Sequence, residues 1–382
     1  MELQTTHLVA WLGFIGGAIF AVTVNKTHFC SMGSISDWIN MDSKVRFRSW
    51  MLAAGIAVVA TQALVLTGVV DLSGIMYLTP NFLWFGYIFG GLLFGIGMTL
   101  GSGCGQKTLT RVGTGNLKSL VVLLMLGFTA YMTLRGVTAL FRIATVEGTA
   151  IDLGAAGFQD QSVATFISRA TGLGNTAAVI LSTLVIGVGL IWYAFKDSAF
   201  RGNFNAILAG MVIGLLAMGA WIVTGVIGYD DFEPVPLEGL TFISPTGNTI
   251  NYLMTYTGST INFGIALVFG MLAGSFLYAL VTRSFRIEYF SSRADLVNHL
   301  VGGALMGFGG VLSLGCTIGQ GVTGVSTLSL GSFVALFSII AGGALTMKMQ
   351  YYMIDESFAR SLRLTLADFK LLPAPRNAST SS

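Results

Sequence analysis

Three cysteines stand where apolar stretches end and small, polar residues begin. Cys30 lies in T-H-F-C-S-M-G, Cys104 in G-S-G-C-G-Q-K-T and Cys316 in S-L-G-C-T-I-G-Q-G. An odd number of cysteines excludes a complete disulfide framework. None has the C-x-x-C spacing or paired histidines of a metal site, so we expect neither a metal nor a cofactor. Only His28 is close enough in sequence to act as a base, which disfavours covalent catalysis.

The chemistry that remains is soft recognition of an anion. A thiol is a weak S–H donor with a polarisable sulfur, so thiols in series could hand a sulfur-containing anion along by weak bonds. The residues after Cys104 and Cys316 could begin short re-entrant helices, whose N-terminal N–H groups favour anions. The candidate substrate-binding residues are Cys30, Cys104, Cys316, His28, Gln106, Lys107, Thr317 and Gln320.

Each of these residues also has a simpler interpretation. A buried cysteine is usually a small hydrophobic side chain. Basic residues beside an apolar span are ordinary flanking charges on the cytoplasmic side. Glutamine and threonine could merely bond across helices. Because two of the cysteines belong to a repeat and none lies in a plain Leu/Val run, we favour the functional interpretation.

Composition places these residues in a membrane. Of the 382 residues 54% are hydrophobic and only 10% are charged, whereas soluble domains have about 25% charged residues. Lipid must therefore cover much of the surface. Fifty glycines without a period of three suit close helix packing and broken helices. The chain has no dense basic run, so we expect no nucleic acid partner.

A membrane helix needs about 20 mostly apolar residues. Nine segments meet this length, which predicts an all-α polytopic membrane protein. The predicted spans are 8–24, 49–70, 82–102, 119–140, 174–195, 204–227, 260–281, 296–315 and 330–350. We expect one transport domain over residues 1–350 and a short cytoplasmic tail over 351–382.

Loop charges predict the orientation. Lysine and arginine gather after spans 1, 3, 5 and 7 and in the tail, whereas the loops after spans 2, 6 and 8 have none. Only the loop after span 4 is mixed. Because basic loops stay in the cytoplasm, the N-terminus is expected outside and the C-terminus inside.

An internal repeat relates two of the cysteines. Residues 90–104, GGLLFGIGMTLGSGC, and residues 302–316, GGALMGFGGVLSLGC, share eight of fifteen positions at a constant offset of 212. The first copy ends a descending span and the second an ascending one. We therefore expect inverted halves, about 1–140 and 200–350, with the substrate site near the midplane between them.

These motifs, with H-F-C-S-M-G-S-I-S-D and F-I-S-P-T-G-N at 242–248, resemble the YeeE/YedE family of sulfur-transport membrane proteins, over nearly the whole chain to about residue 350. The resemblance implies an hourglass-like inverted repeat of nine spanning helices plus short re-entrant ones. It implies uptake of thiosulfate, relayed by S–H hydrogen bonds past cysteines that match Cys30, Cys104 and Cys316. A small cytoplasmic sulfur-carrier protein often accompanies the family. The chain departs from the family's frequent G-G-C, with Gly-Ser-Gly-Cys and Leu-Gly-Cys instead.

Three functions stay open from the sequence. The first is inner-membrane uptake of thiosulfate or a similar anion, without enzymatic activity. The second is a membrane thiol enzyme that moves sulfur by persulfide exchange. The third is a permease for a selenium compound or another solute, with structural cysteines.

Overall fold

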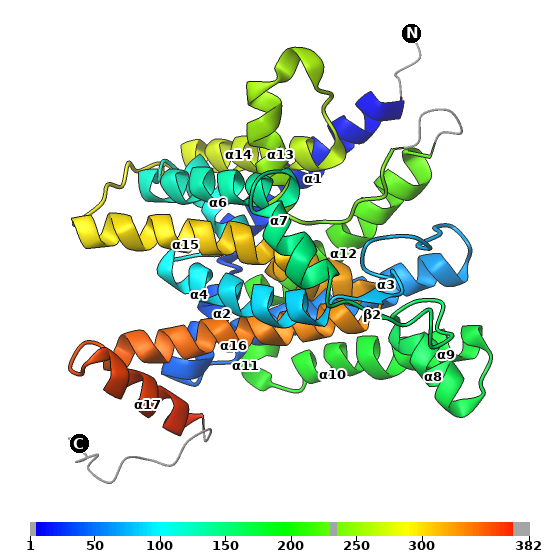
Figure 1. Ribbon diagram of the computed structural model, residues 1–382. Helices are drawn as coiled ribbons and strands as arrows, with labels where there is room; N and C mark the ends of the chain where they lie inside the picture. The colour runs from blue at the N-terminus through cyan, green and yellow to red at the C-terminus, as the bar shows by residue number, and fades with distance from the viewer. Residues whose placement is uncertain (1–4, 230–234, 370–382) are drawn as a thin grey trace.

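The computed structural model describes residues 5–229 and 235–369, and most of these are helical (Figure 1). The helices of the first half are α1 (Thr5–Thr27), α2 (Ser31–Met41), α3 (Val45–Leu66), η1 (Gly86–Gly90), α4 (Gly91–Leu100), α5 (Gly105–Gly113) and α6 (Leu117–Arg135). Between the halves lie α7 (Ala139–Phe141), η2 (Arg142–Glu147), α8 (Val163–Thr171), α9 (Asn175–Ser182), η3 (Thr183–Val188), α10 (Gly189–Phe195) and α11 (Ser198–Arg201).

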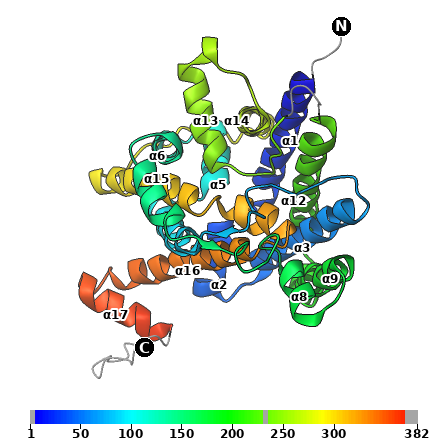
Figure 2. The same cartoon turned by 45° about the vertical axis from the view of Figure 1, so that its right-hand side comes forward.

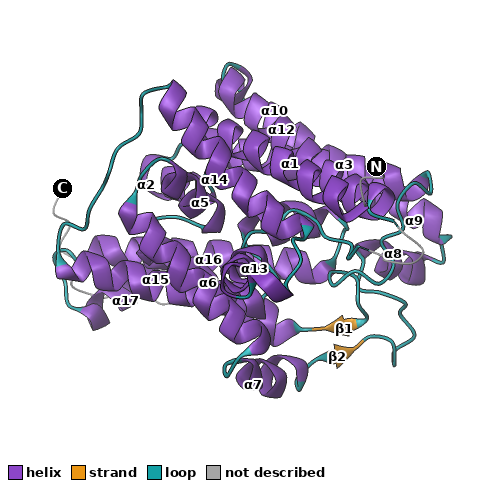
Figure 3. Ribbon diagram, turned by 90° about the horizontal axis from the view of Figure 1, so that it is seen from above, coloured by secondary structure: helices purple, strands orange, loops and turns teal. Residues whose placement is uncertain are grey.

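The second half continues with the same kinds of element. It contains α12 (Phe204–Ile222), η4 (Val223–Ile227), α13 (Ile243–Met254), η5 (Tyr256–Gly258), α14 (Phe263–Val281), α15 (Arg293–Leu312), η6 (Gly319–Gly324), α16 (Leu330–Tyr352) and α17 (Phe358–Asp368). Apart from the 3-10 turn η5, the η segments are π-helical. The strands β1 (Asn81–Phe82) and β2 (Ile151–Asp152) form one short antiparallel pair at the edge of the helices (Figure 3).

Nine helical segments of the described residues are long and apolar enough to cross a membrane, which confirms the prediction of an all-α polytopic protein. They are Thr5–Met41, Val45–Leu66, Gly86–Gly113, Leu117–Arg135, Asn175–Phe195, Phe204–Ile227, Phe263–Val281, Arg293–Leu312 and Leu330–Tyr352. Each overlaps one predicted span. Figure 1 shows α1 beginning at one end of the bundle and α17 lying at the other, as an odd number of crossings requires.

Close glycine contacts define which helices run parallel. A Cβ added at Gly13 or Gly17 of α1 would touch Phe263 or Leu267 of α14, so residue numbers rise together along both helices. Gly210 and Gly214 of α12 meet α3 in the same parallel sense. Figure 2 shows α1, α12 and α3 grouped on one side of the molecule. These directions agree with the alternation of the nine predicted spans.

The two copies of the repeat cross each other in opposite directions. A Cβ at Gly90 would lie 2.7 Å from the carbonyl oxygen of Gly309, and one at Gly97 would lie 2.7 Å from that of Gly302. At the offset of 212, Gly302 matches Gly90 and Gly309 matches Gly97. Each copy therefore contacts the other through the same pair of positions, as a two-fold relation requires. The contacts support the predicted inverted repeat, whose placement in a bilayer stays a prediction.

The tail begins as helix. Helix α16 runs to Tyr352, and α17 packs back against it through a 2.7 Å hydrogen bond from the Tyr352 hydroxyl to Asp368. Residues 370–382 of the predicted tail lie outside the described residues, as do residues 1–4.

Candidate functional site

All three cysteines occupy the same position in the backbone, immediately before a short helix. Cys30 precedes α2, Cys104 precedes α5, and Cys316 precedes the helical turn that contains η6. The residue two places earlier has a left-handed backbone each time, with φ of 55° at His28, 57° at Ser102 and 59° at Leu314. The chain thus makes the same sharp turn into each helix, and the short helices predicted after Cys104 and Cys316 are present.

Two of the thiols accept an N–H group from the helix that they precede. The amide of Gly33 lies 3.4 Å from Cys30 Sγ, and the amide of Gly319 lies 3.4 Å from Cys316 Sγ. Each sulfur therefore acts as an N-terminal cap, with its S–H proton left to donate elsewhere. Cys104 makes no such bond. All three are buried free thiols.

Ser31 joins the three helix starts. Its hydroxyl oxygen lies 3.8 Å from Cys104 Sγ and donates to Thr317 Oγ1 at 2.9 Å. Because Ser31 follows Cys30 and Thr317 follows Cys316, residues more than 200 positions apart meet at one buried point. Ser31 was not among the predicted site residues, although its place beside Cys30 was a usable signal.

The space at the meeting point is small. A cavity of about 20 Å³ beside Ser31 and Thr317 is otherwise lined by apolar side chains, among them Trp50 and Leu336. That volume holds about one water.

The two predicted glutamines differ. No described residue hydrogen-bonds either amide atom of Gln106, although the side chain is fully buried. Gln320 donates through Nε2 to the carbonyl oxygen of Ser313, and its Oε1 has no described partner. A buried amide without a partner costs free energy, so Gln106 is the predicted polar residue whose bonding capacity the fold leaves unused.

Basic residues gather near Cys30 and Cys104. Lys107 lies close enough to both thiols to interact electrostatically with them, and Arg46 and Arg111 are close to Lys107. His28 is exposed on the turn before Cys30 and interacts with Lys107 and Arg46. The structure thus brings His28 and Lys107 to the same end of the site, where an anion would be attracted.

The surroundings of Cys316 contain hydroxyl groups instead. The Thr241 hydroxyl and the Phe242 amide hydrogen-bond its thiol, and Tyr77 lies nearby. Tyr77 and Thr241 also line a cavity of about 130 Å³. Sequence reasoning missed both residues, because neither is near a cysteine in sequence and only the fold brings them there.

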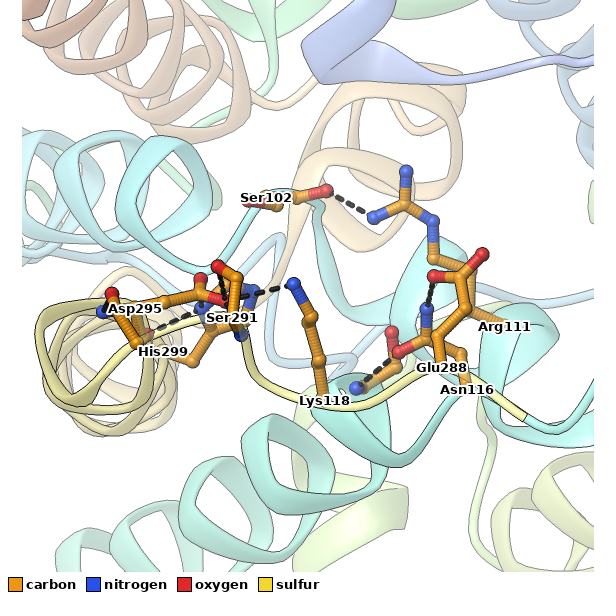
Figure 4. Close-up of polar contacts among 10 residues, drawn as sticks. Ser102, Arg111, Asn116, Lys118, Glu288, Ser291, Asp295 and His299 are labelled. Carbon is orange, nitrogen blue, oxygen red and sulfur yellow. Dashed lines mark hydrogen bonds and ion pairs between the residues drawn. The ribbon is translucent and has the colours of Figure 1, made fainter.

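A polar cluster holds the turn before Cys104 in place (Figure 4). Arg111 donates to the carbonyl oxygen of Ser102 at 2.6 Å, which fixes the left-handed residue of that turn. Lys118 forms a 2.7 Å ion pair with Asp295, which also faces His299. The Lys118–Asp295 pair joins the starts of α6 and α15, and these two residues line a cavity of about 310 Å³ together with Ser102 and Arg111.

The described residues contain no group of three or more His, Cys, Asp or Glu side chains able to hold a metal. Each cysteine lies at its own helix start, and Cys30 and Cys104 are close enough to interact electrostatically. Two thiols are fewer ligands than a protein metal site ordinarily has.

Comparison with known proteins gives a consistent result. A family model described as sulphur transport matches residues 26–345. The chain is 26% identical over 342 residues to the thiosulfate transporter TsuA of Escherichia coli, covering 86% of this chain and 91% of that protein. It is 27% identical over 339 residues to the thiosulfate transporter TsuA of Spirochaeta thermophila, covering 87% and 96%. Both relatives are named as transporters, which agrees with the prediction of a transporter rather than an enzyme.

Proposed function

Because the chain belongs to the sulphur transport family, we propose that it carries thiosulfate, or a closely similar sulfur anion, across the inner membrane. The observation that supports this best is the contact of Ser31 with both Cys104 and Thr317. This contact supports a site at which the three helix starts that carry the thiols come together. The two relatives named as thiosulfate transporters support the choice of substrate.

In the proposed path the anion passes Cys316, then Cys104, then Cys30. The order follows from the surroundings of each thiol. Cys316 lies next to the cavity lined by Tyr77 and Thr241, whose loops carry no lysine or arginine and are expected outside. Cys30 lies near Lys107 and Arg46, at the expected cytoplasmic end. Each thiol donates a weak S–H bond, so no site holds the anion too tightly.

The orientation of the halves belongs to the same proposal. The N-terminus lies outside, the C-terminus lies in the cytoplasm, and residues 1–350 form one transport domain with inverted halves. The antiparallel contact of α4 with α15 supports this topology. Reporter fusions after Asp71 and after Lys196 should mark opposite sides of the membrane. Two fusions on the same side would contradict the proposed orientation.

Transport of a dianion needs a driving force. Against an inside-negative potential each negative charge costs about 2.3 kcal/mol per 100 mV, so a dianion costs about twice that. Consumption of the ion by a small cytoplasmic sulfur-carrier protein would draw uptake inward. The basic residues around Cys30 would then form the exit at which such a protein receives the anion.

The experiment is uptake by vesicles reconstituted with the purified protein. Thiosulfate with its two sulfurs separately labelled is added outside, and both labels should arrive inside in one intact ion. Loss of the outer sulfur to a protein persulfide would instead support the thiol enzyme. A selenium oxyanion that is taken up while thiosulfate is not would support the third function. A sulfur auxotroph that expresses the chain should also grow on thiosulfate.

A further inference from the structure

Among the described residues that line the cavity beside Cys316, one has a carboxylate. Glu238 lines it together with hydroxyl, amide and apolar side chains, among them Tyr77, Thr241, Ser244 and Asn248. Glu238 lies outside the nine candidate spans, on the segment between η4 and α13. It belongs to the loop after the sixth span, and the described fold places it in the wall of the cavity.

The carboxylate has N–H and O–H neighbours but no cation among the residues that line the cavity. The amide of Gly264, at the start of α14, donates to it, and Tyr77 is close enough to interact with it electrostatically. The Thr224 hydroxyl donates to the backbone carbonyl of Glu238 at 3.0 Å, which fixes the segment. No Lys, Arg or His is found among the described lining residues, and α12 and α13 contribute Trp221, Ser244 and Asn248. Burial raises the pKa of the Glu238 carboxyl, and the Gly264 amide partly offsets this.

The same cavity reaches the first thiol of the proposed path. Thr241 lines the cavity and its hydroxyl bonds Cys316, and a Cβ added at Gly319 would lie 2.7 Å from Thr241 Oγ1 and 3.6 Å from the Tyr77 hydroxyl. An anion that reaches Cys316 by way of this cavity passes the Glu238 carboxylate, and Tyr77 interacts electrostatically with both Cys316 and Glu238. Two negative charges that come close together in the cavity repel each other when little water separates them.

We propose that Glu238 takes up a proton from the outer solution as the anion enters this cavity. This rests on the proposed function, because it assumes that an anion passes Cys316. The proton adds to a carboxylate oxygen, no other bond changes, and the charge of the occupied cavity is one unit less negative. By linkage, a bound anion favours protonation and a bound proton favours the anion to the same degree.

The coupling has a measurable sign. The anion binds the protonated form of Glu238 better than the ionised form. Its apparent affinity therefore changes with pH between the pKa of Glu238 in the empty cavity and the higher pKa of Glu238 in the occupied cavity. The apparent affinity for thiosulfate should therefore rise as the outer pH falls, by up to about tenfold per pH unit for one linked proton. Thiosulfate itself stays a dianion in this range, so the substrate contributes no titration.

The first test compares thiosulfate binding and uptake between about pH 5.5 and 8 in the wild type, in Glu238→Gln and in Asp71→Asn. Glutamine keeps the acceptor for the Gly264 amide, so the variant should fold and bind thiosulfate with an affinity that depends less steeply on pH than that of the wild type. Asp71 is an outer carboxylate whose pKa is lowered by hydrogen bonds from Ser73, so its variant should keep the wild-type pH slope. An unchanged slope in Glu238→Gln overturns the inference.

The second test needs no variant. Thiosulfate added to the wild-type protein in weakly buffered detergent should remove up to about one proton per chain from solution, whereas chloride should not. Binding without proton uptake overturns the inference, as does an affinity set by sodium rather than by pH. In either case the proposed function stands. Absence of thiosulfate binding at every pH would contradict the proposed function itself.

Discussion

The two halves of the molecule repeat one backbone but place different side chains on it. The turns before Cys104 and Cys316 have φ of 57° and 59° at positions 212 residues apart. Yet the sulfur of Cys316 accepts a hydrogen bond from the Gly319 amide of the helix that it precedes. The sulfur of Cys104 instead contacts the hydroxyl of Ser31, which belongs to α2. The helix α13 also begins after a break in the chain, but the residue before it is Phe242 and not a cysteine. The ring of Phe242 packs against the ring of Phe20, with the two ring centres 5.1 Å apart.

The charges differ in the same way. Lys107, Arg46 and Arg111 lie at the end of the site that holds Cys30 and Cys104, and Tyr77, Thr241 and Glu238 lie at the Cys316 end. A repeated scaffold with unlike ends gives a path with a direction, because an anion is favoured more at one end than at the other. Under the proposed function, the repeat would build the passage, and the substitutions between its copies would decide how an anion behaves in it.

The strongest test of the comparison removes the thiols that the copies share. Cys104→Ala or Cys316→Ala should abolish thiosulfate uptake, because each deletes an S–H donor at a buried point of the path. Cys→Ser at the same positions should lower uptake by about tenfold, because it keeps a donor but loses the polarisable sulfur. Labelled thiosulfate uptake in reconstituted vesicles measures both effects.

Stability has to be separated from transport in these variants. Serine is a good N-terminal cap, so Cys316→Ser should elute from size exclusion as the wild type does and insert in the same amount. Full transport by a variant in which all three cysteines are alanine would mean that the cysteines only pack the interior and take no part in transport.

The sequence predicted the scaffold better than the site. The runs of apolar residues identified the spans, and the two copies of the fifteen-residue motif related Cys104 to Cys316. Both predictions were possible because each pattern is contained in a short stretch of sequence. Ser31, Tyr77 and Thr241 escaped prediction because their role depends on contacts between distant segments. The third predicted span, 82–102, also begins four residues before η1, since Asn81 and Phe82 pair with β2.

A smaller effect is expected from charge alone. Lys107→Gln should weaken thiosulfate uptake by about tenfold, or about 1.4 kcal/mol, because it removes the cation nearest to Cys30 and Cys104. Lys26→Gln is the matched control, since Lys26 is exposed at the end of α1 and should change uptake little. Added salt should reduce the difference in thiosulfate uptake between the wild type and Lys107→Gln, because salt screens the charge of Lys107. Equal losses in both variants would mean that general flanking charge, and not the site, attracts the anion.

The finest distinction between the halves lies in the two glutamines. Gln106→Met removes a buried amide that no described residue hydrogen-bonds, so the free energy of unfolding should rise, by roughly 1–3 kcal/mol at most. Gln320→Met breaks the bond to the Ser313 carbonyl and should lower it by about 1 kcal/mol. If the unused amide of Gln106 serves the anion, uptake should fall in Gln106→Met even as thermal stability in detergent rises. Unfolding and uptake are measured on the same preparations of both variants. A Gln106→Met protein that is more stable and transports normally would show that this amide is a packing defect, and the polar site would then consist of the thiols, Ser31 and Lys107.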